Sequence, residues 1–161
     1  MNFPSLLRAV VGIGLTFFAL DACAQQQIYT PSELNANPEA YQHRVVTVRG
    51  YITLEPEGHN LTESKELNDE FARGVDSGGK NGFNPRSYRK YCLTIANPGL
   101  MYRNRDTLKG KTLVVTGEFL ADYNDYKKNH AMDFWACPLP TGIVIDMDDL
   151  KRRYPDLLRK P

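Results

Sequence analysis

The residues between 55 and 63 include the types that bind metal ions or transfer protons: Glu55, Glu57, His59 and Glu63. Carboxylates beside one imidazole could hold a divalent cation. Glu55 and Glu57 flank a proline turn, however, and nothing in the sequence holds them in one geometry. The spacing of a metal-binding helix, HExxH, is missing around all three histidines, which are His43, His59 and His130. We therefore expect a solvated acidic turn and surface histidines, with no metal or other cofactor.

The chain lacks the sequence patterns of an assembled nucleophile. No G-x-S-x-G elbow surrounds the candidate serines, which are Ser64, Ser77 and Ser87. The glycine-rich segment 78–82 does not have the G-x-x-x-x-G-K-[ST] spacing of a phosphate loop. A disulfide between the two cysteines of the mature chain would remove a Cys–His mechanism. We expect a protein without enzymatic activity.

Tyrosines interleaved with cations form the pattern that favours binding. The candidate binding residues are Tyr88, Arg89, Tyr102, Arg103, Tyr123, Tyr126, Lys127 and Lys128, with Arg86, Lys90, Arg105 and His130 as neighbours. Flat rings stack on sugars or bases, and arginine adds charge. The segment 121–131 is polar and has no period that would bury its rings, so we expect its tyrosines to be exposed. The alternative is a polar rim whose tyrosines only cover the fold.

The first 24 residues have the organisation of a secretory signal peptide. Arg8 supplies the positive n-region, residues 9–20 form an apolar run, and small residues follow. Ala22-Cys23-Ala24 fits signal-peptidase cleavage before Gln25. The segment 20–23 is also similar to a lipobox, in which Cys23 would be lipidated. We expect a periplasmic or secreted protein, and association with a membrane only if Cys23 carries lipid.

The charge balance of the chain excludes one class of partner. With 20 Lys and Arg against 19 Asp and Glu, the net charge of +1 lacks the basic excess of a dedicated nucleic-acid binder. Export also argues against nucleic acid as the physiological ligand. At 161 residues, one domain over residues 25–161 is expected.

Period-two alternation and glycine punctuation predict five strands in this domain. The expected strands are 44–54, with a change of phase at Gly50, then 60–64, 89–96, 112–120, and 132–137 continued over 141–145. Hydroxyl or carboxylate caps predict short helices after Thr30 and after Asp146, the second reaching about Tyr154. A connecting helical segment would use Leu100, Met101 and Leu108 as apolar anchors, and about 73–87 would be a mobile loop.

Glycines inside the first and fourth strands favour sharply bent strands that close into a small barrel. The fold class is therefore mainly β: a five-stranded barrel like that of the oligonucleotide/oligosaccharide-binding (OB) fold, with short N-terminal, connecting and C-terminal helices. Barrels of this kind bind ligands along the face of the second and third strands.

Two blocks of the sequence resemble small exported OB-fold-like bacterial proteins of unassigned function. The first is Asn37-Pro38-Glu39-Ala40-Tyr41 followed by alternating valines up to Gly50-Tyr51, with His43 where those proteins have glycine. The second begins at Lys109-Gly110-Lys111 and continues through Val114, Val115, Gly117 and Phe119. The resemblance implies a fold and a compartment and brings no catalytic residues.

Only Cys92 and Cys137 remain after removal of the leader, and an exported chain meets an oxidising compartment. In an OB-type sheet we expect the third and fifth strands to be antiparallel neighbours, which would bring these cysteines within bonding distance. The expected function is a non-catalytic binding module for a protein partner or a cell-envelope glycan. The alternative is a secreted or envelope-anchored inhibitor or immunity-type protein that acts on an enzyme.

Overall fold

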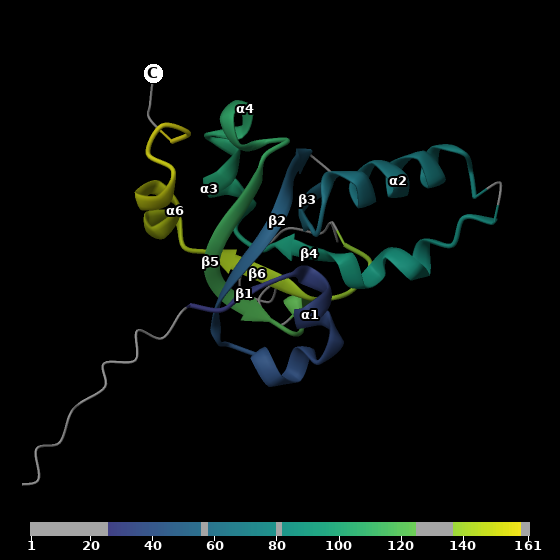
Figure 1. Ribbon diagram of the computed structural model, residues 1–161, viewed down its shortest axis with the longest axis horizontal. Coiled ribbons are helices and arrows are strands. Elements are labelled where there is room, and N and C mark those ends of the chain that lie inside the picture. The colour runs from purple at the N-terminus through teal and green to yellow at the C-terminus, as the bar shows by residue number, and fades with distance from the viewer. Residues whose placement is uncertain (1–25, 56–57, 80–81, 125–136, 159–161) are drawn as a thin grey trace, which may run out of the picture.

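The computed structural model describes residues 26–55, 58–79, 82–124 and 137–158. Within these ranges the strands form one mixed sheet in the order β1-β2-β3-β4-β6-β5, and β5 pairs again with β2. The second pairing closes five strands into a barrel and leaves β1 (Ile28–Tyr29) as an extra strand beside β2 (Figure 1). The predicted fold class, a mainly β five-stranded barrel with short helices, is confirmed.

The long strand β2 (Val45–Glu55) bends at Gly50 and thereby serves two neighbours. Its first part pairs with β5 (Thr112–Leu120), and its last part with β3 (Gly58–Thr62). A Cβ atom at Gly50 would lie 2.6 Å from Cγ of Leu61, so the Leu61 side chain packs directly on the β2 backbone at this position. The predicted phase change at Gly50 is wrong, because the even-numbered positions are buried on both sides of it. Pairing with two partners bends the strand without turning its inward face outward.

The barrel closes through β4 (Cys92–Ile95) and β6 (Gly142–Ile145), which pair in parallel. The antiparallel arrangement expected for these strands is wrong. The other four pairs in the ring are antiparallel. Strand direction cannot alternate around a closed ring with an odd number of members, so one of the five pairs has to be parallel. The expected strand 132–137 lies outside the described residues except for Cys137, which stands in a bend before β6.

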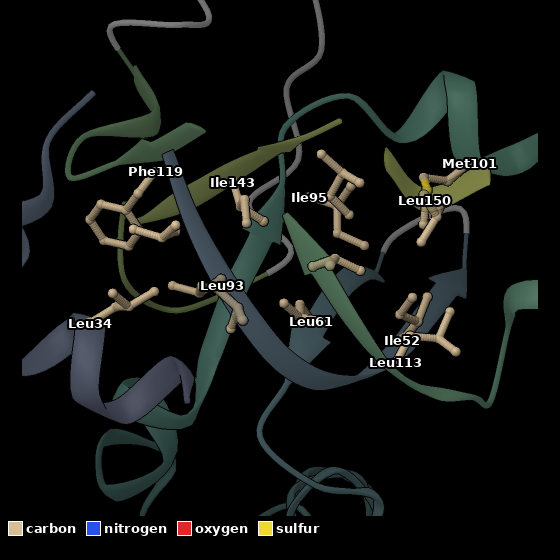
Figure 2. Packing of buried hydrophobic residues seen from close by; sticks show 14 of the residues in the cluster. Leu34, Ile52, Leu61, Leu93, Ile95, Met101, Leu113, Phe119, Ile143 and Leu150 are labelled. Carbon is tan, nitrogen blue, oxygen red and sulfur yellow. The ribbon is translucent and has the colours of Figure 1, made fainter. Parts of the chain in front are cut away.

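The apolar core fills the barrel from end to end (Figure 2). At one end, Leu34 of α1 (Pro31–Ala36) lies beside Phe119. At the other end, Met101 of α3 (Pro98–Tyr102) and Leu150 of α6 (Met147–Arg153) are fully buried, as is the last residue of α4 (Arg105–Leu108). The prediction that Leu100 is an apolar anchor is wrong, since 40% of its surface is exposed.

The predicted helix starts are confirmed by their caps. Thr30 and Glu33 form a capping box at α1, and a 3-10 helix, η1 (Pro38–Tyr41), follows. The carboxylate of Asp146 accepts two backbone N–H bonds at the start of α6. His43 adopts φ +59°, a conformation that glycine adopts without strain.

The segment between β3 and β4 forms a projection, residues 64–91, that we call the arm. It consists of α2 (Lys65–Asp76) and a 3-10 helix, η3 (Pro85–Tyr91), and Figure 1 shows α2 extending away from the barrel. The predicted loop over 73–87 is therefore too long at both ends, because α2 continues to Asp76 and η3 begins at Pro85. The strand predicted over 89–96 begins only at Cys92. Asn84 caps a 3-10 helix that starts with Pro85 and continues to Tyr91, so residues 89–91 are helical.

No helix in the described ranges is both long enough and apolar enough to span a bilayer. The predicted leader, its cleavage site and Cys23 lie outside the described residues.

Candidate functional site

The structure separates the candidate binding residues of the sequence into different regions. Tyr88 and Arg89 belong to η3 of the arm. Tyr102 belongs to α3, where its hydroxyl donates to the backbone carbonyl of Glu55 and its ring meets His59 edge-on. Arg103 borders another hollow, between α3 and α6. The expected single surface is therefore divided, and Tyr102 supports the end of the barrel.

The expected exposure of Tyr123 is wrong. Only 4% of its surface is accessible, and its ring packs against Ala96 and Leu120. Its backbone N–H donates to the carbonyl of Pro140, which draws the segment after β5 towards the chain before β6. The residues around Tyr123 are polar, so nothing in the sequence indicated this inward contact. Four predicted neighbours, Tyr126, Lys127, Lys128 and His130, lie outside the described residues.

The arm is held together by a small aromatic cluster. Ser64 caps helix α2, and its hydroxyl accepts the Leu67 N–H at 3.2 Å. The rings of Phe71, Phe83 and Tyr88 lie with centroids 5.4–5.8 Å apart. A Cβ atom at Gly74 would come within 2.1 Å of the Phe83 ring. The ring thus packs directly on the backbone of α2 and fixes η3 beside it.

A hollow of about 40 Å³ lies at the root of the arm, and we call it the arm hollow. Aromatic rings from both arm helices line it, with polar groups of β3 and the disulfide region completing it. Its lining residues are Asn60, Thr62, Leu67, Asn68, Phe71, Tyr88, Tyr91, Cys92 and Pro138. Its β-strand wall belongs to the second and third strands of the barrel, the face on which the sequence placed a ligand groove.

One residue that lines the arm hollow, Asn60, has an unsatisfied polar atom. The side-chain oxygen of Asn60 is buried and has no hydrogen-bond partner. Burying an amide oxygen without a partner costs free energy, roughly 1–3 kcal/mol. Sequence reasoning missed Asn60 and Thr62 as lining residues. Alternation with the inward-pointing Leu61 was the signal that places both on the outer face.

Tyr88 also borders a second, open hollow of about 430 Å³ at the tip of the arm. This tip hollow is more polar, and its lining includes Glu70, Arg73, Ser77 and Ser87. A hydrogen bond to Glu70 raises the pKa of Tyr88, which keeps its hydroxyl protonated as a donor. Tyr88 therefore forms part of the boundary of both hollows.

The predicted disulfide between Cys92 and Cys137 is confirmed, with Cα atoms 5.7 Å apart. It ties the start of β4 to the segment before β6 and places Pro138 at the edge of the arm hollow. The bond is compatible with an oxidising compartment. It also fixes one wall of the hollow against another part of the chain.

The residues expected to form an acidic turn do not converge on a metal. Glu55 pairs with Arg105 at 2.7 Å and with Lys109, and the hydrogen bond to Lys109 lowers the pKa of its carboxyl. Glu63 instead accepts the backbone N–H of Ser32. Over the described ranges, no group of three His, Cys, Asp or Glu residues is arranged to hold a metal ion. Glu57 lies outside these ranges.

The expected surface position of His59 is wrong. Its side chain points inward with Leu61, only 3% of the residue is exposed, and neither ring nitrogen has a hydrogen-bond partner. Burial lowers the pKa of His59, so the ring is neutral at neutral pH. His43 is exposed as expected, with its Nδ1 2.7 Å from a carboxylate oxygen of Glu118.

Each candidate serine is engaged in local structure. Ser64 caps α2, the Ser77 hydroxyl donates to the carbonyl of Gly74, and the Ser87 hydroxyl donates to the carbonyl of Asn84. The Ser64 side chain also hydrogen-bonds the Glu66 carboxylate within the first turn of α2. What the arm hollow offers chemically is stacking and hydrogen bonding.

Comparison of the chain with protein-family models, curated proteins and solved structures found no match in any of the three. The functional argument therefore depends on the geometry of the site.

Proposed function

We propose that this protein is an exported, non-catalytic binding module that holds a protein partner or a cell-envelope glycan at the arm hollow. The observation that carries the proposal is the combination of three aromatic rings with the polar side chains of Asn60 and Thr62 in one hollow. Binding sites are typically concave and largely apolar, with a few polar groups that orient the ligand. The arm hollow has this composition, and it lies on the barrel face through which OB-type folds bind.

The fixed walls of the hollow support the same proposal. The aromatic cluster holds η3 on α2, and the disulfide holds Pro138 beside β4. A site whose walls are already in place loses less conformational entropy on binding. This is a property of recognition sites and requires no chemical step.

The alternative, an inhibitor or immunity-type protein, draws support from the arm as a whole. It projects from the barrel as a compact pair of helices (Figure 1), a shape that can enter the cleft of an enzyme. In that case the outer surface and tip of the arm, rather than the hollow at its root, would bind the partner.

Affinity capture from an envelope extract tests the proposal. The mature protein is immobilised, and the extract is applied untreated, after protease digestion, or after glycan digestion. We expect Tyr88→Ala and Thr62→Val to reduce capture, because both residues line the arm hollow. Tyr154→Ala is the matched control, since this half-buried tyrosine follows α6 on the opposite side of the barrel (Figure 1). Unchanged capture by folded Thr62→Val and Tyr88→Ala would refute the proposed site.

The enzyme treatments distinguish the kinds of partner. Loss of capture only after protease indicates a protein, and loss only after glycan digestion indicates a glycan. Capture of an envelope enzyme whose activity falls on binding would favour the inhibitor alternative.

A further inference from the structure

The 3-10 geometry of η3 sorts its side chains into rows. With three residues per turn and a rise of about 2.0 Å per residue, positions i and i+3 lie above one another about 6 Å apart. Tyr88 and Tyr91 therefore form one row, and both line the arm hollow. Arg86 and Arg89 form the adjacent row and are exposed. A row of cations thus runs along a row of aromatic rings.

The two arginines of this row have no carboxylate of their own. In the described part of the chain neither guanidinium forms an ion pair. Of the four acidic residues of the facing helix α2, Glu66 hydrogen-bonds Ser64, Asp69 pairs with Lys65, and Glu70 hydrogen-bonds the Tyr88 hydroxyl. Lys90 lies 4.9 Å over the centroid of the Tyr91 ring and adds a third cation. The edge of the hollow is therefore complementary to a ligand with more than one negative charge.

The strands beneath the hollow cannot accept an extended peptide as a further strand. β3 is paired on both sides, with β2 and β4, and β4 is paired with β3 and β6. The usual route by which a sheet captures a peptide, main-chain pairing along a free edge, is therefore closed at this site. A ligand here has to be held by side chains: rings, an amide, hydroxyls and guanidinium groups.

Resting on the proposed function, we propose that the arm selects a carboxylated glycan. Sugar rings would contact the partly exposed rings of Tyr88 and Tyr91 at the edge of the hollow, and carboxylates of successive sugars would pair with Arg86 and Arg89. A substituent that enters the hollow would meet the polar side chains of Asn60 and Thr62. The row of arginines makes this an anion-selective site and not a general sugar platform.

A matched pair of oligosaccharides tests the inference by titration calorimetry. The probes are trigalacturonic acid and its methyl ester, which differ in charge and share the same sugar rings. We expect the acid to bind the mature protein and the ester to bind at least about tenfold more weakly, because charge-assisted hydrogen bonds are lost. Arg86→Gln/Arg89→Gln should weaken binding of the acid by a similar factor.

The control variant is Arg44→Gln/Arg49→Gln, which removes two exposed cations at and before β2 and changes the net charge equally. It should bind the acid like the wild type. Equal weakening by both double variants would contradict the inference, because the arm would then contribute no more than general charge.

The remaining outcomes separate this inference from the proposed function. Equal binding of acid and ester would refute anion selection and leave the hollow as a glycan site. If a short polyglutamate peptide or single-stranded oligothymidylate binds as tightly as trigalacturonic acid, or more tightly, the site recognises negative charge alone. This outcome also overturns the inference. Binding of neither oligosaccharide would refute the carboxylated glycan, while capture from the envelope extract would still decide the proposed function.

Discussion

Removing the disulfide between Cys92 and Cys137 should cost about 4 kcal/mol of the free energy of unfolding. The two cysteines are 45 residues apart in the sequence. Closing a loop of this length lowers the entropy of the unfolded chain by an amount equal to about 4 kcal/mol at 25 °C. Domains of this size are typically stable by 5–15 kcal/mol, so the loss is a large share of the total. In the chain of about 137 residues that cleavage of the predicted leader would leave, it corresponds to a decrease in Tm of about 14 °C.

Urea denaturation of the mature protein, with and without reductant, measures this loss. The matched variant Cys92→Ala/Cys137→Ala lacks the bond permanently, so reductant should not change its unfolding curve. Reduced wild type and the double variant should agree within about 1 kcal/mol, since the variant also removes two buried sulfur atoms. A decrease of less than about 1 kcal/mol on reduction, with free thiols verified by intact mass, would refute the loop-closure reasoning.

Three further predictions concern the barrel. Burial lowers the pKa of His59, so the unfolded chain takes up the proton first and the free energy of unfolding should fall as the pH drops below 6.5. In His59→Gln, the urea midpoint should therefore depend less on pH between pH 7.5 and 5. The same pH dependence in this variant and in the wild type would contradict the buried neutral ring. Gly117→Ala should lower the free energy of unfolding, measured in urea, by about 2 kcal/mol, because the new Cβ atom would lie 2.3 Å from the Val144 carbonyl oxygen. The control Gly99→Ala, whose Cβ atom would meet open space, should change it by no more than about 0.5 kcal/mol. Equal effects of the two substitutions would exclude backbone crowding at Gly117. Tyr123→Ala should lower the free energy of unfolding by about 3 kcal/mol in thermal melts, and a change within about 0.5 kcal/mol would return the ring to the surface.

Much of the barrel could be predicted from local patterns in the sequence. Alternating valines indicated β2 and β5, and Gly50 indicated the bend that lets β2 pair with two neighbours. Threonine and aspartate caps located α1 and α6. The parallel pairing of β4 with β6 was not predicted. The relative direction of these two strands depends on how all five strands close into the barrel, and the sequence of neither strand indicates it.

The site was predicted less well, because its position depends on how one inserted segment packs. Tyr88 and Arg89 were identified from their composition, but they were expected at the entry to the third strand, after a mobile loop over about 73–87, and not in a 3-10 helix. Its glycines indicated mobility, whereas Gly74 permits the contact with Phe83 that orders it. His59 shows the opposite error, since its polar character was weighed above the alternation that places it inward with Leu61.

Site-specific photocrosslinking in intact cells tests most directly whether the arm hollow is the binding site. A photoreactive residue would replace Asn68, which lines the hollow, or as a control the exposed Arg152 of α6 on the other side of the barrel (Figure 1). We expect irradiation to yield a covalent adduct with an envelope component at position 68 and none at position 152. An adduct at position 152 together with none at position 68 would contradict the proposed site and place binding on another face of the barrel.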